Sequence, residues 1–224
     1  MTAALMLGEL VAIEQLLHKD QFRDLELMGL LGKRLTAWLE SFLDGVGVGT
    51  GPTVKGRVAA SAVLEGRVYV GEGAVIEPSA FVKGPCYIGR DAQVRHAAYI
   101  RGSVYVGPGA VVGHTTEVKG AVFFDGAKAG HFAYVGDSIL GRNVNLGAGT
   151  KLANLKLRGD EVSIKHPVTG QRLSTGLKKL GALMGDDSQT GCNAVLSPGS
   201  VLMPGTAVLP CVHYHGTLTK GIAR

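Results

Sequence analysis

The sequence is short of several residue types, and each shortage excludes a class of protein. Only 18% of its 224 residues are charged and 46% are hydrophobic, the reverse of the balance in a disordered chain. No apolar run reaches the length of a membrane span. Glu9 and Glu14 interrupt the apolar N-terminus, which also lacks the basic stretch of a signal peptide. We therefore expect a folded protein without a membrane partner.

Cysteine and clustered positive charge are also scarce. The three cysteines, Cys86, Cys192 and Cys211, are odd in number and form no CxxC pair, which predicts no disulfide framework and a reduced, cytoplasmic setting. The net charge is +5, but no block of lysine and arginine and no basic-aromatic stripe occurs. This pattern favours small anionic ligands over nucleic acid.

What the sequence has in abundance is glycine, with 34 residues, and a repeat of six. A large apolar residue occupies every sixth position from Val58 to Phe124, and a small or β-branched residue follows four positions after each of them up to Val118. The rhythm slips, resumes over residues 134–152, and resumes again over residues 184–208. Since three hexapeptides make one triangular coil, the sequence predicts a parallel β-helix of about seven coils.

Three regions follow from this pattern. Leucines at helical spacing predict two amphipathic helices within residues 1–44, with the second ending before Gly45. Residues 45–57 are expected to form a linker and first turn, and residues 58–224 the β-helix. Two short strand-like segments around a Pro/Gly turn predict a projecting hairpin inserted at about 156–183.

A few residues have the spacing and type that chemistry requires. Arg101 and Lys119 are 18 residues apart, so we expect them on adjacent coils about 4.8 Å apart. Their repulsion would be relieved by a shared phosphate or by solvent. His131 lies in the first break of the repeat, where it is either a general base or a structural histidine. The backbone amides of residues 143–150 are candidates for an oxyanion site; the alternative is that these residues only form the corners of the coil.

The segments 128–137, 141–150 and 153–154 closely resemble the acetyltransferase domain of the bifunctional N-acetylglucosamine-1-phosphate uridyltransferase/glucosamine-1-phosphate acetyltransferase family. The second half, including residues 176–182, is similar to the archaeal sugar-1-phosphate nucleotidylyltransferase/acetyltransferases. The resemblance implies a left-handed coil, a homotrimer and acetyl-CoA as co-substrate. No nucleotidyltransferase signature occurs in residues 1–44, so a separate nucleotidyltransferase is a possible partner.

The resemblance also implies roles for individual residues. His131 would be the base, Asn154 would hold the sugar near the acetyl group, and the Ala148 amide would stabilise the oxyanion. The substrate would be bound by Arg101, Lys119, Tyr134 and Asn145, and acetyl-CoA would contact Cys192 and Pro210 between subunits.

The sequence thus predicts an acetyl-CoA-dependent N-acetyltransferase for an amino-sugar 1-phosphate or a nucleotide-linked amino sugar. Two alternatives stay open. One is a non-catalytic trimeric protein that binds a sugar nucleotide or acts as a scaffold. The other is a metal-dependent enzyme on the same fold, suggested by the 18-residue spacing of His96 and His114, although no metal is expected because His213 and His215 are remote.

Overall fold

The structure is a computed structural model that describes residues 5–224, and its main body is a β-helix of three parallel sheets. The covered sheet lies under the helices and contains β1 (Thr53–Val54), β4 (Val68–Val70), β7 (Cys86–Ile88), β10 (Val104–Val106), β13 (Val122–Phe123), β16 (Ile139–Leu140), β21 (Ala182–Met184), β24 (Ser200–Leu202) and β27 (Thr217–Leu218). The lower sheet contains β2 (Arg57–Val58), β5 (Val75–Ile76), β8 (Gln93–Val94), β11 (Val111–His114), β14 (Lys128–His131), β17 (Asn145–Leu146), β22 (Gln189–Thr190), β25 (Ala207–Val208) and β28 (Ile222–Ala223). The front sheet contains β3 (Val63–Glu65), β6 (Phe81–Lys83), β9 (Tyr99–Arg101), β12 (Glu117–Lys119), β15 (Tyr134–Gly136), β18 (Lys151–Leu152), β23 (Val195–Leu196) and β26 (His213–Tyr214).

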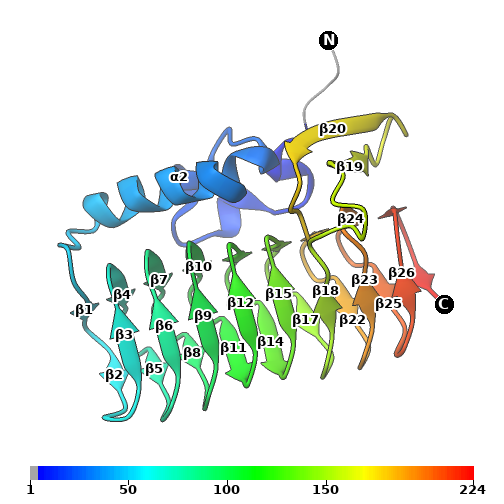
Figure 1. Cartoon of the computed structure of the whole chain (residues 1–224). Coiled ribbons are helices and arrows are strands. Elements are labelled where there is room, and N and C mark those ends of the chain that lie inside the picture. Colours follow the sequence, from blue (N-terminus) through cyan, green and yellow to red (C-terminus); the bar gives the residue numbers. More distant parts are fainter. Residues whose placement is uncertain (1–4) are drawn as a thin grey trace.

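The winding confirms the expected fold class. In Figure 1 the chain advances from left to right while it passes from the front sheet over the covered sheet to the lower sheet, which is a left-handed path. Within residues 5–224 two sheets hold nine strands each, so the estimate of about seven coils is too low. It missed β1 ahead of Val58, the short strands after Val208, and β14 within the first break.

The interior contains both predicted columns of the repeat. Large residues such as Val82, Ile88 and Val94 alternate with small ones such as Ala80 and Ala92, and all are essentially inaccessible to solvent. Large side chains fill the flats of the triangle and small ones fit near its corners. This continuous apolar column is the main source of stability, because each coil buries its interior only against its neighbours.

The register after β12 differs from the prediction. The interior positions are Val118, Phe123, Ala129, Val135 and Leu140, so two of the four steps are five residues long. Both short steps lead into strands of the covered sheet, β13 and β16. The repeat is therefore interrupted by two one-residue deletions rather than by an inserted loop.

Two interior assignments were consequently wrong. Phe124 is buried outside the coil, under the helices, and Tyr134 points outward. Residues 130 and 131 of the supposed break at 130–133 belong to strand β14, which pairs with β11 and places His131 opposite His114. A Cβ atom on Gly113 would lie only 1.8 Å from the Gly130 carbonyl oxygen, so glycine is needed for these strands to approach so closely.

The N-terminal residues form a helical layer rather than two regular helices. It consists of η1 (Leu7–Glu9), η2 (Ile13–Gln15), α1 (Lys19–Phe22), η3 (Leu27–Leu30) and α2 (Gly32–Gly45). The second predicted helix is confirmed as α2. The first is broken because its backbone bonds elsewhere: the Leu7 amide donates to the Leu25 carbonyl at 3.0 Å, and the Ala12 amide to Asp186 Oδ2 at 2.9 Å.

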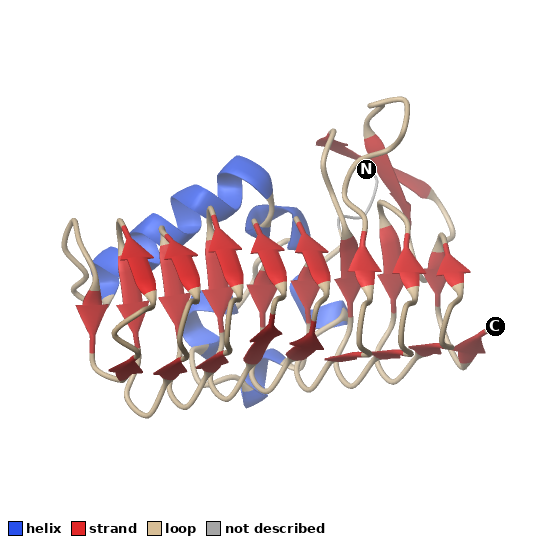
Figure 2. Cartoon of the chain, turned by 60° about the horizontal axis from the view of Figure 1, so that its bottom comes forward, coloured by secondary structure: helices blue, strands red, loops and turns tan. Residues whose placement is uncertain are grey.

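This layer covers one sheet only, as Figures 1 and 2 show. Tyr69, Tyr87 and Tyr105 stack outward from the covered sheet with ring centroids 5.1 Å apart. Phe22 and Phe42 pack edge-on against this column. The layer and the sheet thereby form a second apolar core next to the interior of the coil.

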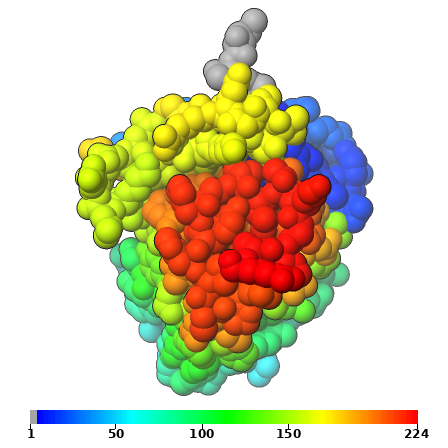
Figure 3. Space-filling view, turned by 90° about the vertical axis from the view of Figure 1, so that its right-hand side faces the viewer, coloured from blue at the N-terminus to red at the C-terminus, as the bar shows by residue number. Residues whose placement is uncertain are grey.

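The predicted hairpin is present. Strands β19 (Val162–Lys165) and β20 (Arg172–Leu177) pair antiparallel and project beside the helical layer, on the same side of the coil. Figure 3, which looks onto the C-terminal coil, shows the hairpin above this coil and the helical layer behind it at the upper right. Among the helices of residues 5–224, none is long and apolar enough to cross a membrane.

Candidate functional site

The front sheet places the two predicted cations side by side. Arg101 ends β9 and Lys119 ends β12, and the two residues are direct partners in the parallel ladder. The 18-residue spacing therefore corresponds to one coil at this point, as the sequence predicted.

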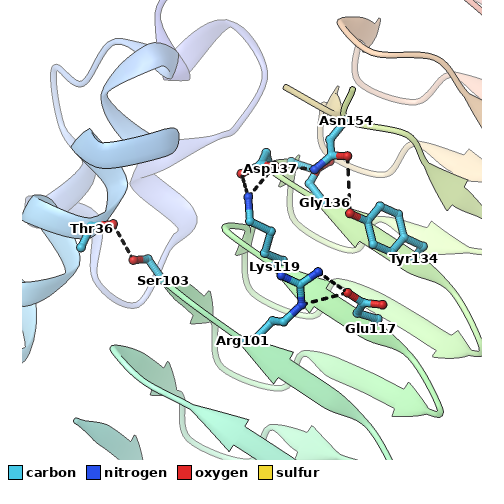
Figure 4. A network of polar contacts seen from close by, with 10 residues as sticks. Thr36, Arg101, Ser103, Glu117, Lys119, Tyr134, Gly136, Asp137 and Asn154 are labelled. Atoms are coloured by element: carbon cyan, nitrogen blue, oxygen red, sulfur yellow. Dashed lines mark hydrogen bonds and ion pairs between the residues drawn. The ribbon is translucent and has the colours of Figure 1, made fainter. Parts of the chain in front are cut away.

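The anions beside these cations belong to the protein itself. Arg101 donates from Nε and Nη2 to Glu117 Oε1 at 3.0 and 2.6 Å, and Lys119 Nζ donates to the two carboxylate oxygens of Asp137 at 2.8 and 2.9 Å (Figure 4). The hydrogen bonds to Glu117 raise the pKa of Arg101. The cations thus need neither a bound phosphate nor solvent to coexist, because Glu117 and Asp137 supply the anions that the sequence argument did not consider.

Asp137 is the centre of this group. Its side chain is only 5% exposed, and it accepts hydrogen bonds from Lys119 and from Asn154 Nδ2, the latter at 2.5 Å. Tyr134 Oη donates to Asn154 Oδ1 at 3.4 Å. We call Arg101, Glu117, Lys119, Tyr134, Asp137 and Asn154 the front cluster. Four of these were predicted from the sequence.

Tyr134 lies flat across the end of its own strand. A Cβ atom on Gly136 would be 2.8 Å from Tyr134 Oη and 2.6 Å from Asn154 Nδ2, so any larger residue here would displace these two side chains. Burial, together with the carboxylates of Glu117 and Asp137, raises the pKa of Tyr134. Its hydroxyl therefore stays protonated and can donate to a ligand or to Asn154.

A second set of predicted residues stacks along the corner between the lower and front sheets. His131, Ala148, Cys192 and Pro210 occupy this corner on successive coils. The Gly149 amide donates to the His131 carbonyl at 3.1 Å, the Asn193 amide to the Ala148 carbonyl at 2.8 Å, and the Cys211 amide to the Cys192 carbonyl at 2.9 Å. We call this row the corner ridge.

The corner ridge has groups that are available to a ligand. His131 is exposed, and its ring makes no hydrogen bond to another residue of the described chain. Within residues 5–224 the Ala148 amide likewise donates no hydrogen bond. Cys192 and Pro210 are exposed. Tyr134 connects the two sets, because it follows His131 by three residues and reaches Asn154.

Asn145 is not brought to the front cluster. It starts β17 on the lower sheet, opposite Lys128 and Gln189, and is exposed there. Conversely, sequence reasoning missed Glu117 and Asp137. Asp137 carried a usable signal, because it lies 18 residues after Lys119. The coil between these two residues is one residue shorter than 18, however, so that Lys119 pairs with Gly136, and the repeat count did not resolve this.

The suggested metal site finds no support in the geometry. Among the residues that the structure describes, no group of three histidine, cysteine, aspartate or glutamate side chains lies close enough to hold a metal ion. The His96 ring instead pairs through Nδ1 with the Pro78 carbonyl at 3.0 Å.

Fold and site together define a hexapeptide-repeat β-helix with polar groups along one sheet and one corner. Residues 82–174 match the model of the GMPPB C-terminal domain. The chain is 47% identical over 75 residues to the bifunctional sugar-1-phosphate nucleotidylyltransferase/acetyltransferase of Sulfurisphaera tokodaii, covering 34% of this chain and 18% of that protein. It is 32% identical over 193 residues to the bifunctional protein GlmU of Methanocaldococcus jannaschii, covering 84% and 46%.

These matches confirm the resemblance predicted from the sequence, and the chain spans less than half the length of these two relatives. Among solved structures, the UDP-N-acetylglucosamine acyltransferase of Francisella novicida aligns with a TM-score of 0.42 at 13% identity, over 73% of this chain and 61% of that one.

Proposed function

We propose that the chain is an acetyl-CoA-dependent N-acetyltransferase that acts on an amino sugar carrying a phosphate. One observation carries the proposal: the exposed His131 ring and the free Ala148 amide occupy adjacent coils of the corner ridge, next to the front cluster. A base, an oxyanion donor and cations are the groups that transfer of an acyl group to the amine of an anionic sugar requires. The similarity to bifunctional acetyltransferases supports the same chemistry.

In this proposal His131 accepts a proton from the sugar amine, and the amine nitrogen attacks the thioester carbon of acetyl-CoA. A C–N bond forms, the C–S bond breaks, and the sulfur leaves as the thiol of coenzyme A after it takes up a proton. The Ala148 amide donates to the carbonyl oxygen while that oxygen carries negative charge. Tyr134 and Asn154 orient the sugar.

The cations have unequal tasks in this scheme. The Arg101 side chain is 38% exposed and Glu117 is 36% exposed, so their pair opens to a phosphate at little cost. Lys119 is held by the buried Asp137 and stays in place. Arg101 is therefore the group expected to turn toward the phosphate, while Lys119 provides a fixed positive charge.

The proposal includes a homotrimer in which acetyl-CoA lies along the corner ridge, over Cys192 and Pro210, against a neighbouring subunit. Exposed apolar side chains next to this surface favour such packing: Tyr99 is 43% exposed on the front sheet, and Phe132 is 53% exposed on the ridge itself. A separate nucleotidyltransferase would act on the same sugar.

The first prediction concerns the base. His131→Ala should lower kcat by roughly 10²–10⁴-fold, because a positioned general base contributes about that factor. Turnover is measured as the mass of the acetylated sugar rather than with a thiol reagent, since Cys192 and Cys211 are exposed. His96→Ala, which removes a histidine from the same corner, is the matched control. Full turnover in His131→Ala on every acceptor that the wild type uses would exclude the assigned base.

An acceptor screen tests the function itself. Glucosamine-1-phosphate, galactosamine-1-phosphate and nucleotide-linked amino sugars are each offered with acetyl-CoA. Acetylation of at least one is expected. If calorimetry detects binding of these sugars but no acceptor is acetylated, the chain is a binding protein and the proposal is wrong.

A further inference from the structure

A cavity of about 660 Å³ opens where the front sheet meets the covered sheet. Its walls come from the helical layer, from the corners after β9, β12 and β15, and from the segment around β20. Lys119 and Asp137 of the front cluster lie on its floor. Its volume is in the range of pockets that enclose an entire small ligand of roughly 300–1,000 Å³.

The cavity is lined with more positive than negative charge. Lys33 and Arg34 come from the first turn of α2, Lys179 follows β20, and Lys119 comes from β12, whereas Asp137 is the only acidic residue among those that line it in residues 5–224. Within the same described residues, Lys33, Arg34 and Lys179 form no ion pair. Three cations therefore face this space without compensation from the protein.

The walls are fixed relative to one another. Thr36 Oγ1 on α2 and Ser103 Oγ after β9 are 2.7 Å apart (Figure 4). A Cβ atom on Gly32 would lie 3.4 Å from Leu177 Cδ2, so α2 and the end of β20 are in contact. Met28 and Leu177 add apolar lining. The cavity thus combines an apolar wall with a cationic one.

We propose that this cavity binds the nucleoside diphosphate of a nucleotide-linked amino sugar, which makes the acceptor a sugar nucleotide rather than a free sugar phosphate. The nucleobase packs on the apolar wall, and the two phosphates form ion pairs with Arg34, Lys179 and Lys119. The sugar then extends from Lys119 along Tyr134 toward the corner ridge. This inference rests on the proposed function. A sugar monophosphate would use Arg101 and Lys119 and leave the rest of the cavity empty.

Coenzyme A also carries a diphosphate, but its proposed contacts, Cys192 and Pro210, lie on the corner ridge at the opposite edge of the front sheet. Calorimetry with the full chain distinguishes a nucleoside diphosphate from the diphosphate of coenzyme A as the ligand of the cavity. UDP, GDP and coenzyme A are titrated in turn into the wild type, an Arg34→Ala/Lys179→Ala variant, and a Lys55→Ala/Arg57→Ala control. The control removes the same charge from exposed positions in the first coil.

UDP or GDP should bind the wild type and the control equally and the cavity variant roughly tenfold or more weakly, because two charge-assisted contacts are lost. Coenzyme A should bind all three alike. The inference is overturned if neither UDP nor GDP binds the wild type, or if the cavity variant binds them as tightly as the wild type does. It is also overturned if only coenzyme A binds the cavity variant more weakly than the wild type. The single variant Arg34→Ala repeats the test if the double variant unfolds.

The titrations need no turnover, so the two proposals can fail separately. Nucleotide binding that depends on Arg34 and Lys179, without acetyl transfer to any acceptor, would refute the proposed function and leave the cavity assignment intact. Acetylation of glucosamine-1-phosphate by a chain that binds no nucleoside diphosphate would refute only the cavity assignment.

Discussion

At the scale of single residues, Asp137 organises the front cluster without being a group that reacts. It accepts hydrogen bonds from Lys119 and Asn154, which in the proposed function neutralise charge and orient the sugar, and it is almost inaccessible itself. A buried carboxylate with two donors fixes both side chains before a ligand arrives, which lowers the entropic cost of binding.

Asp137→Asn should therefore raise the KM of the acceptor by roughly tenfold or more and change kcat less, because the shape is kept and the charge that holds Lys119 is lost. Steady-state kinetics with varied acceptor measures this split. Asp187→Asn is the matched control, since Asp187 also has a positive φ, 59° against 44°, at a corner of the coil. Equal KM values in both variants would show that Asp137 does not position the substrate-binding groups.

A second residue-scale prediction concerns the tyrosine column. Tyr105 is fully buried, and its hydroxyl has no hydrogen-bond partner among the described residues, whereas Tyr87 Oη lies 2.9 Å from His18 Nε2. Tyr105→Phe should leave the free energy of unfolding unchanged or raise it by about 1 kcal/mol, and Tyr87→Phe should lower it by about 1 kcal/mol. Denaturant unfolding of both variants measures these changes in the free energy of unfolding. The reverse order would mean that the Tyr105 hydroxyl is satisfied in solution.

At the scale of elements, the repeat predicted strands well wherever one face was interior and the other exposed. It failed near Phe123 and Phe124, which are both large and both buried, but in different cores. A strand covered on both sides loses the alternation that fixes its register. Tyr69, Tyr87 and Tyr105 were a readable signal of the covered sheet, since outward aromatics at intervals of 18 require something to bury them.

The helical layer should make stability depend on pH. Burial lowers the pKa of His18, which packs against Phe42 and Tyr87. As the pH falls below the ordinary value near 6.5, the unfolded chain binds a proton that the folded chain refuses, so stability decreases down to the lowered pKa. Asp125, whose pKa is raised by burial, acts in the opposite direction at lower pH, above its ordinary value near 3.9.

Denaturant midpoints at pH 7.5 and 5.5 measure this effect. The wild type should lose stability over this interval, and His18→Gln should lose less, because glutamine does not titrate. His213→Gln, which changes an exposed histidine in the last coils, should behave as the wild type does. If His18→Gln has the same pH dependence as the wild type, the docking of the layer is not sensitive to this proton.

At the scale of the whole molecule, sequence reasoning obtained the rod and the alignment of Arg101 with Lys119 from a periodic count, and the hairpin from a local turn signal. It could not obtain the cavity, whose walls come from α2, three corners and β20. Such juxtapositions depend on how non-periodic segments fold back over the coil, and spacing carries no information about that.

Asp186 has a consequence for how the molecule is made. Its amide donates to the Leu10 carbonyl at 2.9 Å, and its carboxylate accepts from the amides of Ala12 and Arg142 at 2.9 and 2.7 Å. Residues 10 and 12 therefore find this partner only after the ribosome has added more than 170 further residues. Until then residues 10–12 lack this anchor, although Phe22 and Phe42 can already pack on Tyr105 and Tyr87. A chaperone that shields the leucines near this anchor would therefore bind early and be released late.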